Sequence, residues 1–225
     1  MSLTLICNQA AGAALRMLHR FRQGLVIAPV LALTVITAHG ESPTRRELLA
    51  ALRSGGYIIL MRHASSPRDP PDRATANADN TNLERQLDAP GQLAAREMGD
   101  ALRRLRIPIG QVLSSPTYRA LETVKFARLG TATTLPQLGD SGQSMSADKN
   151  GTRAIWLKAK SAEPPPHGKN TLIVTHFPNI LEAYPQTAAG LADGEALILH
   201  PDGRGTASLV TRIRIDEWPR LDSKH

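Results

Sequence analysis

The sequence predicts an α/β layered domain built around a mainly parallel sheet. Two short runs, YIILM at 57–61 and TLIVT at 171–175, are almost wholly apolar, as strands buried on both faces of a parallel sheet are. Segments with helical spacing of apolar residues alternate with such runs along the chain. Apolar residues make up 41% of the 225 residues and charged residues 21%, which is typical of a folded soluble domain. A disordered chain and a multi-span membrane protein are therefore disfavoured.

The first forty residues have the pattern of an export signal. A basic stretch at 16–22 precedes the uncharged run GLVIAPVLALTVIT at 24–37, and small residues follow it before residue 41. The apolar run is shorter than the roughly 20 residues that a membrane-spanning helix needs. We therefore expect a signal peptide over 1–40, which could also start at Met17, and a periplasmic or secreted domain over 41–225 that keeps no stable membrane span.

The charge and cysteine content of the expected domain exclude several function classes. The chain has 27 Lys and Arg against 20 Asp and Glu, and three of the basic residues lie in the export signal, so the domain keeps a small positive excess. Aromatic residues make up only 4%, too few for the stacking surfaces of a nucleic-acid binder. The single cysteine, Cys7, also lies in the signal. A disulfide, a thiolate metal site and a cysteine nucleophile are therefore not expected in the domain.

The first predicted elements are a helix over 44–53 and the strand over 57–61. The segment TRRE at the helix start has the spacing of a capping box, in which two side chains satisfy free backbone N–H groups. Two glycines end this helix. The strand that follows finishes at the polar pair Arg62-His63.

A long loop, a helix, a short strand and a second helix are predicted next. Residues 65–82 are rich in Pro, Asp, Asn, Ser and Thr and lack an apolar period, so we expect a loop. Apolar residues recur at helical spacing over 88–106. A strand is expected over 111–114, and a helix to about residue 129 begins with Ser115 as its N-cap and a proline at its first position.

The carboxyl-terminal third is predicted to add a helix, a strand and a hairpin. Residues 130–150 are rich in Gly, Thr, Ser and Asp and are expected to be mostly loop. A helix over 152–162 and a proline-rich linker precede the strand over 171–175. The apolar runs at 195–200 and 206–213 flank a Pro-Asp-Gly turn, which predicts an antiparallel hairpin.

Polar side chains follow three of the predicted strands. The first is the pair Arg62 and His63, the second is Ser115 with Arg119 one turn into the next helix, and the third is His176. Ligands bind beyond the carboxyl ends of strands in open α/β sheets. Guanidinium groups and the N–H groups of a helix start bind phosphoryl oxygens, and a neutral imidazole can attack phosphorus. The set predicts a phosphate site.

Three segments in this order resemble the motifs of the histidine phosphatase superfamily, also called phosphoglycerate mutase-like. They are LMRHA at 60–64, SSPTYRALET at 114–123 and VTHFPNI at 174–180. The segment LDAPGQLAAREMGDALRRL resembles the helix that follows the first motif, and EALILHPDG at 195–203 resembles a late strand of small bacterial members. The resemblance covers about residues 45–215. It implies a three-layer α/β/α sandwich with a mainly parallel sheet.

The resemblance also implies a function for each matching residue. His63 would form a phosphohistidine, Arg62 and Arg119 would bind the phosphoryl oxygens, and His176 would stabilise the transition state. No metal or other cofactor is expected, because the arginines supply the positive charge. The implied activity is hydrolysis of phosphate monoesters or related phosphoryl groups on a phosphorylated small molecule or a phosphoprotein. The loop over 65–82 is expected to select among such substrates.

No motif identifies the proton donor for the leaving group. In the phytase-like branch of this superfamily, the proton donor is an aspartate directly after the second histidine. Phe177 follows His176 here, which excludes that arrangement. The remaining candidates are Asp140, Glu182 and Glu195. A missing donor leaves open an alternative of the same fold, a weak or inactive protein that binds phosphate ligands. Mutase activity is a third reading, which the expected export disfavours, and the oligomeric state is not indicated by the sequence.

Overall fold

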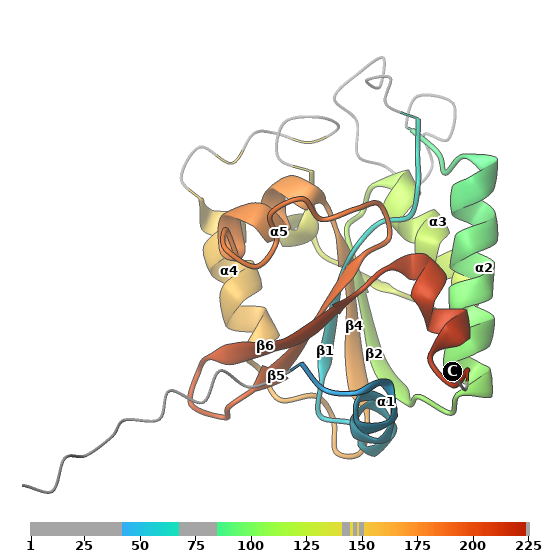
Figure 1. Cartoon of the computed structure of the whole chain (residues 1–225). Coiled ribbons are helices and arrows are strands. Elements are labelled where there is room, and N and C mark those ends of the chain that lie inside the picture. The colour runs from blue at the N-terminus through green and yellow to red at the C-terminus, as the bar shows by residue number, and fades with distance from the viewer. Residues whose placement is uncertain (1–41, 68–84, 141–144, 146–147, 149–150, 224–225) are drawn as a thin grey trace, which may run out of the picture. The chain divides into compact units, whose positions relative to one another are not determined.

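The computed structural model describes residues 42–67, 85–140, 145, 148 and 151–223. These residues form a six-stranded sheet between two layers of helices (Figure 1), which confirms the expected α/β/α sandwich. The predicted signal peptide and most of the predicted loop over 65–82 lie outside the described residues. Within the described ranges, no helix is both long and apolar enough to cross a membrane.

The elements alternate along the chain as the apolar periods predict. In order they are α1 (Arg45–Ser54), β1 (Ile58–Arg62), α2 (Ala89–Arg104), β2 (Ile109–Ser114), α3 (Tyr118–Ala127), β3 (Thr133–Thr134), the 3-10 helix η1 (Pro136–Leu138), α4 (Thr152–Ser161), β4 (Asn170–Thr175), α5 (Phe177–Ala183), β5 (Ala196–Pro201), β6 (Ala207–Ile213) and the 3-10 helix η2 (Ile215–Arg220).

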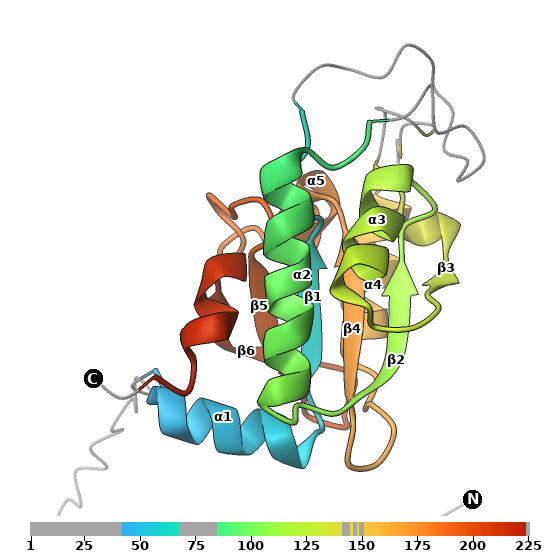
Figure 2. The ribbon, with the colours of Figure 1, turned by 90° about the vertical axis from the view of Figure 1, so that its right-hand side faces the viewer.

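The sheet has the order β3-β2-β4-β1-β5-β6. The first four strands in this order are parallel, whereas β5 runs antiparallel to β1, and β6 runs antiparallel to β5. The predicted hairpin is therefore confirmed, and it extends a parallel sheet at one edge. The carboxyl ends of β2, β4 and β1 lie next to one another at one edge of the molecule, and α1 lies at the opposite end (Figure 2).

Strand β1 shows why its residues are almost all apolar. Ile59 and Met61 belong to the core under α1, α2, α3 and η2, whereas Ile58 and Leu60 belong to the core under α4 and α5. All four side chains are at most 1% exposed. Successive side chains of a strand point to opposite faces, so a strand that is covered on both faces needs apolar residues at every position.

The predicted start of α1 is confirmed in detail. The Thr44 hydroxyl accepts the Glu47 N–H, and the Glu47 carboxylate accepts the Thr44 N–H, which completes the capping box. The helix ends at Gly55, whose φ of 79° lies in the region that favours glycine. Elements that were not predicted are short, namely β3, η1, α5 and η2. Fewer than eight residues leave little room for a hydrophobic period to show.

Candidate active site

The polar residues that follow β1, β2 and β4 meet at the carboxyl edge of the sheet. Backbone hydrogen bonds continue past the strand ends, because the His63 N–H donates to the Thr175 carbonyl and the Ser115 N–H donates to the Val174 carbonyl. Strand β4 lies between β2 and β1, so His176 at its end lies between the other two segments. The structure thus brings together residues that are more than one hundred positions apart in sequence.

The two histidines of this cluster, His63 and His176, are neighbours. Their ring centroids are 5.2 Å apart, and the rings meet edge to face at 64°. The side chains are 4% and 2% exposed, so water has little access to either ring in this state. Such burial favours the neutral form of an imidazole.

The hydrogen bonds of each ring indicate its tautomer. His63 Nδ1 lies 2.8 Å from the Ala64 carbonyl oxygen, which can only accept, so Nδ1 carries the proton. Nε2 then presents a lone pair, which accepts the Nε–H of Arg119 at 3.2 Å. His176 has the opposite tautomer, because its Nδ1 faces Arg119 Nη2 at 3.3 Å and its Nε2 donates to Ser115 Oγ at 2.9 Å.

Burial and positive neighbours both keep these rings neutral. Desolvation, followed by the charge of Arg119, lowers the pKa of His63 to about 3, and the charges of Arg62 and Arg85 act in the same direction. The pKa of His176 lies well below its usual value for the same reasons, with His63 as a further contributor. Both histidines are therefore neutral at physiological pH, and His63 has an available lone pair.

Arg119 is a fully buried cation at the centre of the cluster. It projects from the first turn of α3 and is 0% exposed. Its Nη2 donates to Asp140 Oδ2 at 2.8 Å, and Asp140 is itself only 1% exposed. The other carboxylate oxygen of Asp140 accepts the Met145 N–H at 2.9 Å. Asp140 thus compensates the buried charge and restrains the guanidinium between the two histidines.

The loop that carries Asp140 is held by β4 and α5. Thr175 Oγ1 donates to the Leu138 carbonyl at 2.8 Å, and Asn179 Nδ2 donates to the Gly139 carbonyl at 2.5 Å. Both donors are buried. The site therefore rests on side chains from the third sequence motif, which connect the Asp140 loop to the strand that positions His176.

Arg62 lies at the side of the cluster and is held mainly by the connection between α5 and β5. Its Nη1 donates to the Leu191 carbonyl at 2.9 Å, and its Nη2 forms an ion pair with Asp193. The guanidinium carbon also lies 5.5 Å from the centre of the Phe177 ring, a cation–π distance. The Arg62 side chain is 13% exposed and so has some contact with solvent.

Only one of the three candidate proton donors lies in the site. Asp140 contacts Arg119 directly. Glu182 is exposed on α5 beside Gly151, and Glu195 forms a two-fold ion pair with Arg212. Burial opposes the ionised form of Glu195, but hydrogen bonds from Arg212 and Ala192 outweigh it and lower the pKa. Glu195 therefore holds no proton to give at neutral pH.

Ser115 is not the N-cap of a helix, and that prediction is wrong. Helix α3 begins at Tyr118, with Thr117 as its N-cap. Ser115 Oγ instead accepts the Thr117 N–H at 3.2 Å and the Nε2–H of His176, so a tight turn forms before the helix. Arg119, which can only donate, fixes the tautomer of His176 through Nδ1, and the Ser115 hydroxyl accepts the proton on Nε2. The donors at the start of the helix lie farther along the chain than the sequence predicts.

Arg85 is a site residue that the sequence pattern did not reveal. Its charge lowers the pKa of both histidines, so it lies near them. The segment after it is tied to α3, because Glu122 Oε2 accepts the Leu87 N–H at 2.6 Å. Arg85 comes just before α2, outside the strand ends from which the site was predicted. Its place at the end of a long polar loop was the only available signal.

The two described ends of that loop lie side by side. Ser65 Oγ donates to Asp88 Oδ2 at 2.7 Å, and Ser66 Oγ donates to the Gln86 carbonyl at 2.9 Å. The predicted role of residues 65–82 in selecting a substrate falls largely outside the described residues. Within the described part of the chain, no group of three or more His, Cys, Asp or Glu side chains could hold a metal ion.

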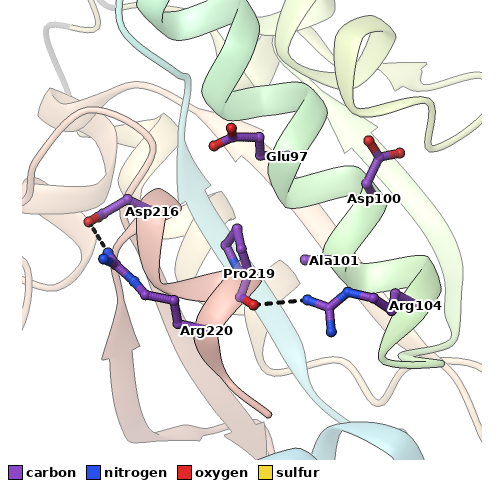
Figure 3. A pocket seen from close by; sticks show the side chains of 7 residues that line it. All are labelled: Glu97, Asp100, Ala101, Arg104, Asp216, Pro219 and Arg220. Carbon is purple, nitrogen blue, oxygen red and sulfur yellow. Dashed lines mark hydrogen bonds and ion pairs between the residues drawn. The ribbon is translucent and has the colours of Figure 1, made fainter. Parts of the chain in front are cut away.

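A groove of about 510 Å³ lies away from these residues, between α2 and η2 (Figure 3). Its charged side chains largely bind one another or the backbone. Arg220 pairs with Asp216, and Arg104 donates to the Pro219 carbonyl. The Arg220 pair lies within η2, and the Arg104 contact attaches η2 to α2, so the groove is a packing boundary between these two elements.

No family model matches the chain, and no curated protein matches it. Among solved structures it is similar to the protein histidine phosphatase SixA complexed with tungstate, with 19% identity and a TM-score of 0.53, over 72% of this chain and 98% of that one.

Two further solved structures cover similar shares. One is the putative phosphohistidine phosphatase SixA from Agrobacterium tumefaciens, at 17% identity and a TM-score of 0.47, over 70% of this chain and 97% of that one. The other is phosphoglycerate mutase from Bacillus anthracis str. Sterne, at 13% and 0.47, over 76% and 99%. The likeness to the tungstate complex shows that the chain has the SixA fold.

Proposed function

We propose that this chain, which has the fold of SixA, is a metal-independent histidine phosphatase that forms a phosphohistidine on His63. The observation that carries the proposal is the state of the His63 ring. It is buried and neutral, its Nδ1 proton is held by the Ala64 carbonyl, and its Nε2 lone pair faces Arg119. A neutral imidazole with a directed lone pair is the form that attacks phosphorus.

In the proposed reaction, a phosphoryl group enters beside Arg119 and takes over its Nε–H, which releases the lone pair of His63 Nε2. The Nε2–P bond forms while the P–O bond to the leaving group breaks, and the leaving oxygen departs with its electron pair. Water then attacks phosphorus, and the N–P electron pair returns to Nε2. Arg62, Arg119 and Arg85 supply positive charge around the equatorial oxygens, and His176 completes the site.

Asp140 is the residue we propose as proton donor. In the ligand-free site its carboxylate pairs with Arg119. A phosphoryl anion that binds the same guanidinium places a second negative group beside the carboxylate, which favours its protonated form. Asp140 then gives the proton to the leaving oxygen and takes one back from the attacking water.

The proposed substrates are a phosphorylated small molecule or a phosphoprotein, and the predicted export signal would place the reaction outside the cytoplasm. SixA is named a protein histidine phosphatase. A phosphohistidine is a phosphoramidate, and such a substrate suits this site, because its leaving group depends less on a proton donor than an alkoxide does.

The test is hydrolysis of 4-nitrophenyl phosphate by the full chain, in the presence of a metal chelator. The nitrophenolate leaves without a proton, so turnover reports on His63 and not on the acid. We expect His63→Ala to abolish turnover, because it removes the proposed nucleophile. The matched control is His167→Ala, which removes an exposed histidine just before the amino end of β4. The site lies beyond the carboxyl ends of the strands, so His167 is at the other end of the sheet.

Turnover that persists in His63→Ala would contradict the phosphohistidine. No turnover in the unmodified chain, with orthophosphate still raising the melting temperature, would support the phosphate-binding alternative. An alkyl phosphate measured in parallel tests the acid. The Asp140→Asn variant should lose the alkyl ester activity by a larger factor than the aryl ester activity, and equal losses would count against Asp140 as donor.

A further inference from the structure

The turn Leu191–Glu195 contacts Arg62 and His63 at four points. Three of them hold Arg62, namely the Leu191 carbonyl at 2.9 Å, the Asp193 carboxylate and the Glu195 carbonyl, which accepts the Arg62 N–H at 3.1 Å. The fourth is the Gly194 N–H, which donates to the His63 carbonyl at 2.9 Å. Gly194 has a φ of 71°, a conformation that few other residues adopt readily. The shape of this turn therefore sets where the Arg62 guanidinium lies.

The turn is itself held by an ion pair that does not reach the histidines. Arg212 Nε and Nη2 donate to the two oxygens of Glu195 at 2.7 and 2.8 Å, and Glu195 Oε2 also accepts the Ala192 N–H at 2.8 Å. Arg212 Nη1 donates to the Ala189 carbonyl at 2.9 Å. One guanidinium thus binds both the middle of the connection after α5 and its last residue.

Sheet geometry explains why these two residues meet. Arg212 on β6 pairs with Leu197 on β5, and Glu195 lies two residues before Leu197. Side chains two residues apart on a strand point to the same face, and diagonal neighbours on adjacent strands are within reach of a long side chain. Glu195 is only 9% exposed, and two parallel N–H···O contacts to an arginine are geometrically specific.

We infer that the Arg212–Glu195 ion pair positions Arg62 for the reaction, by fixing the Leu191–Glu195 turn that holds its guanidinium. The inference rests on the proposed function. Neither Arg212 nor Glu195 touches the phosphoryl group in this scheme. Both act through the turn and are therefore positioning residues, a role that differs from the proton donor once expected of Glu195.

Arg62 needs such a support because its side chain has many rotamers. A long side chain that must adopt one geometry loses conformational entropy on binding, unless its surroundings already restrict it. Arg119 is restricted by the buried histidines and Asp140, whereas Arg62 is partly exposed and is held by contacts with the turn and with Phe177. Without the ion pair, the guanidinium would sample positions that do not face a phosphoryl oxygen.

The test is a double-mutant cycle in the full chain with Arg62→Ala, Arg212→Ala and the double variant. Orthophosphate affinity is measured by calorimetry, and kcat and KM with 4-nitrophenyl phosphate. We expect Arg212→Ala to weaken orthophosphate binding by about tenfold to 100-fold, since small misplacements of a binding group have effects of that size. In the Arg62→Ala background, Arg212→Ala should cause no further loss, because the residue through which it acts is already gone.

The matched control is Arg214→Ala, which removes an exposed arginine that directly follows β6 and pairs with Asp216, and leaves the hydrogen bonds between Arg212 and Glu195 in place. It should lower neither binding nor kcat/KM. If the fold-losses of orthophosphate affinity in the two single variants multiply in the double variant, the inference is overturned. It is also overturned if Arg212→Ala has a reduced melting temperature but a normal orthophosphate affinity. If Arg212→Ala does not fold, Arg212→Lys replaces it, because lysine keeps the charge and lacks the two-fold contact.

The two proposals fail in different ways. If Arg212→Ala causes no further loss of orthophosphate affinity in the Arg62→Ala background, but the unmodified chain shows no turnover, the phosphatase activity is rejected and the positioning role of Arg212 is retained. If turnover depends on His63, but the fold-losses of orthophosphate affinity in Arg62→Ala and Arg212→Ala multiply in the double variant, the phosphatase activity is retained and the positioning role of Arg212 is rejected. A chain that binds no orthophosphate at all would overturn both.

Discussion

Arg62 and Arg119, two arginines of the site, are supported by different parts of the molecule. Arg119 is 0% exposed and is held by side chains of the site itself, namely His63, His176 and Asp140. Arg62 is 13% exposed and is held mostly by backbone groups and by Asp193, in a turn that leads into the antiparallel hairpin. Arg119 thus belongs to the buried centre of the site, whereas Arg62 lies at its partly exposed margin.

Because their surroundings differ, Arg62 and Arg119 should not tolerate substitution of their partners equally. A buried ion pair can neither exchange its partner for water nor relax when one member is removed. A partly exposed pair can do both, because solvent replaces the lost contact and screens the charge. Substitutions around Arg119 should therefore lower both the stability and the activity of the chain, whereas substitutions around Arg62 should lower mainly its affinity for phosphate.

The largest expected effect follows from removal of the buried counter-charge. Asp140→Ala leaves Arg119 buried and uncompensated, and we expect a loss of about 3–5 kcal/mol in the free energy of unfolding. Urea denaturation measures this directly. The control is the double variant Arg119→Met with Asp140→Leu, which removes both charges and should be more stable than Asp140→Ala. A double variant as unstable as the single one would show that lost packing, and not the unpaired charge, is responsible.

A smaller effect, over the range of pH that is measured, is expected from the protonation of His63. Its pKa is about 3 in the folded chain and 6.5 in the unfolded chain, so between these values only the unfolded chain holds the proton. Stability should therefore fall as the pH drops from about 6.5 toward 3, by about 1.4 kcal/mol per pH unit for one proton. Unfolding of the unmodified chain and of His63→Ala between pH 7 and pH 4.5 checks this.

The His63→Ala variant should have a shallower pH slope, because one buried imidazole no longer opposes protonation. His176 acts in the same direction and keeps part of the slope. His167→Ala, which removes an exposed ring, should keep the full slope. Identical slopes in all three proteins would contradict the buried neutral state of His63.

Most of the fold could be predicted from the sequence, because burial on two faces leaves a strong pattern. The runs at 57–61 and 171–175 became β1 and β4, the adjacent central strands, and the TRRE segment formed the capping box of α1. The start of α3 was misplaced at Ser115. A serine followed by proline suits both an N-cap and a tight turn, and here Ser115 Oγ is engaged by the Thr117 N–H and by His176 Nε2, a contact from a distant segment.

The site could be predicted only where it follows a strand. His63 and His176 come directly after β1 and β4, so sheet topology alone brings them together. Arg85 and Asp193 lie in connections, whose paths depend on hydrogen bonds such as Glu122 to Leu87 and Gly194 to His63. Such contacts leave no periodic trace in a sequence. The same reason hid the role of Glu195, which depends on the register of β6 against β5.

The smallest expected effect is that of Asp193→Ala, the change at Arg62 that corresponds to Asp140→Ala at Arg119. Asp193 is 20% exposed, so its loss should cost about 1 kcal/mol or less in the free energy of unfolding, because water can solvate the released guanidinium. The Leu191 carbonyl and the backbone contacts of the turn remain. Orthophosphate affinity should therefore fall less than in Arg212→Ala, which releases the whole turn. Urea denaturation of Asp193→Ala beside Asp140→Ala makes the comparison, and equal losses would show that the margin of the site is as rigid as its core.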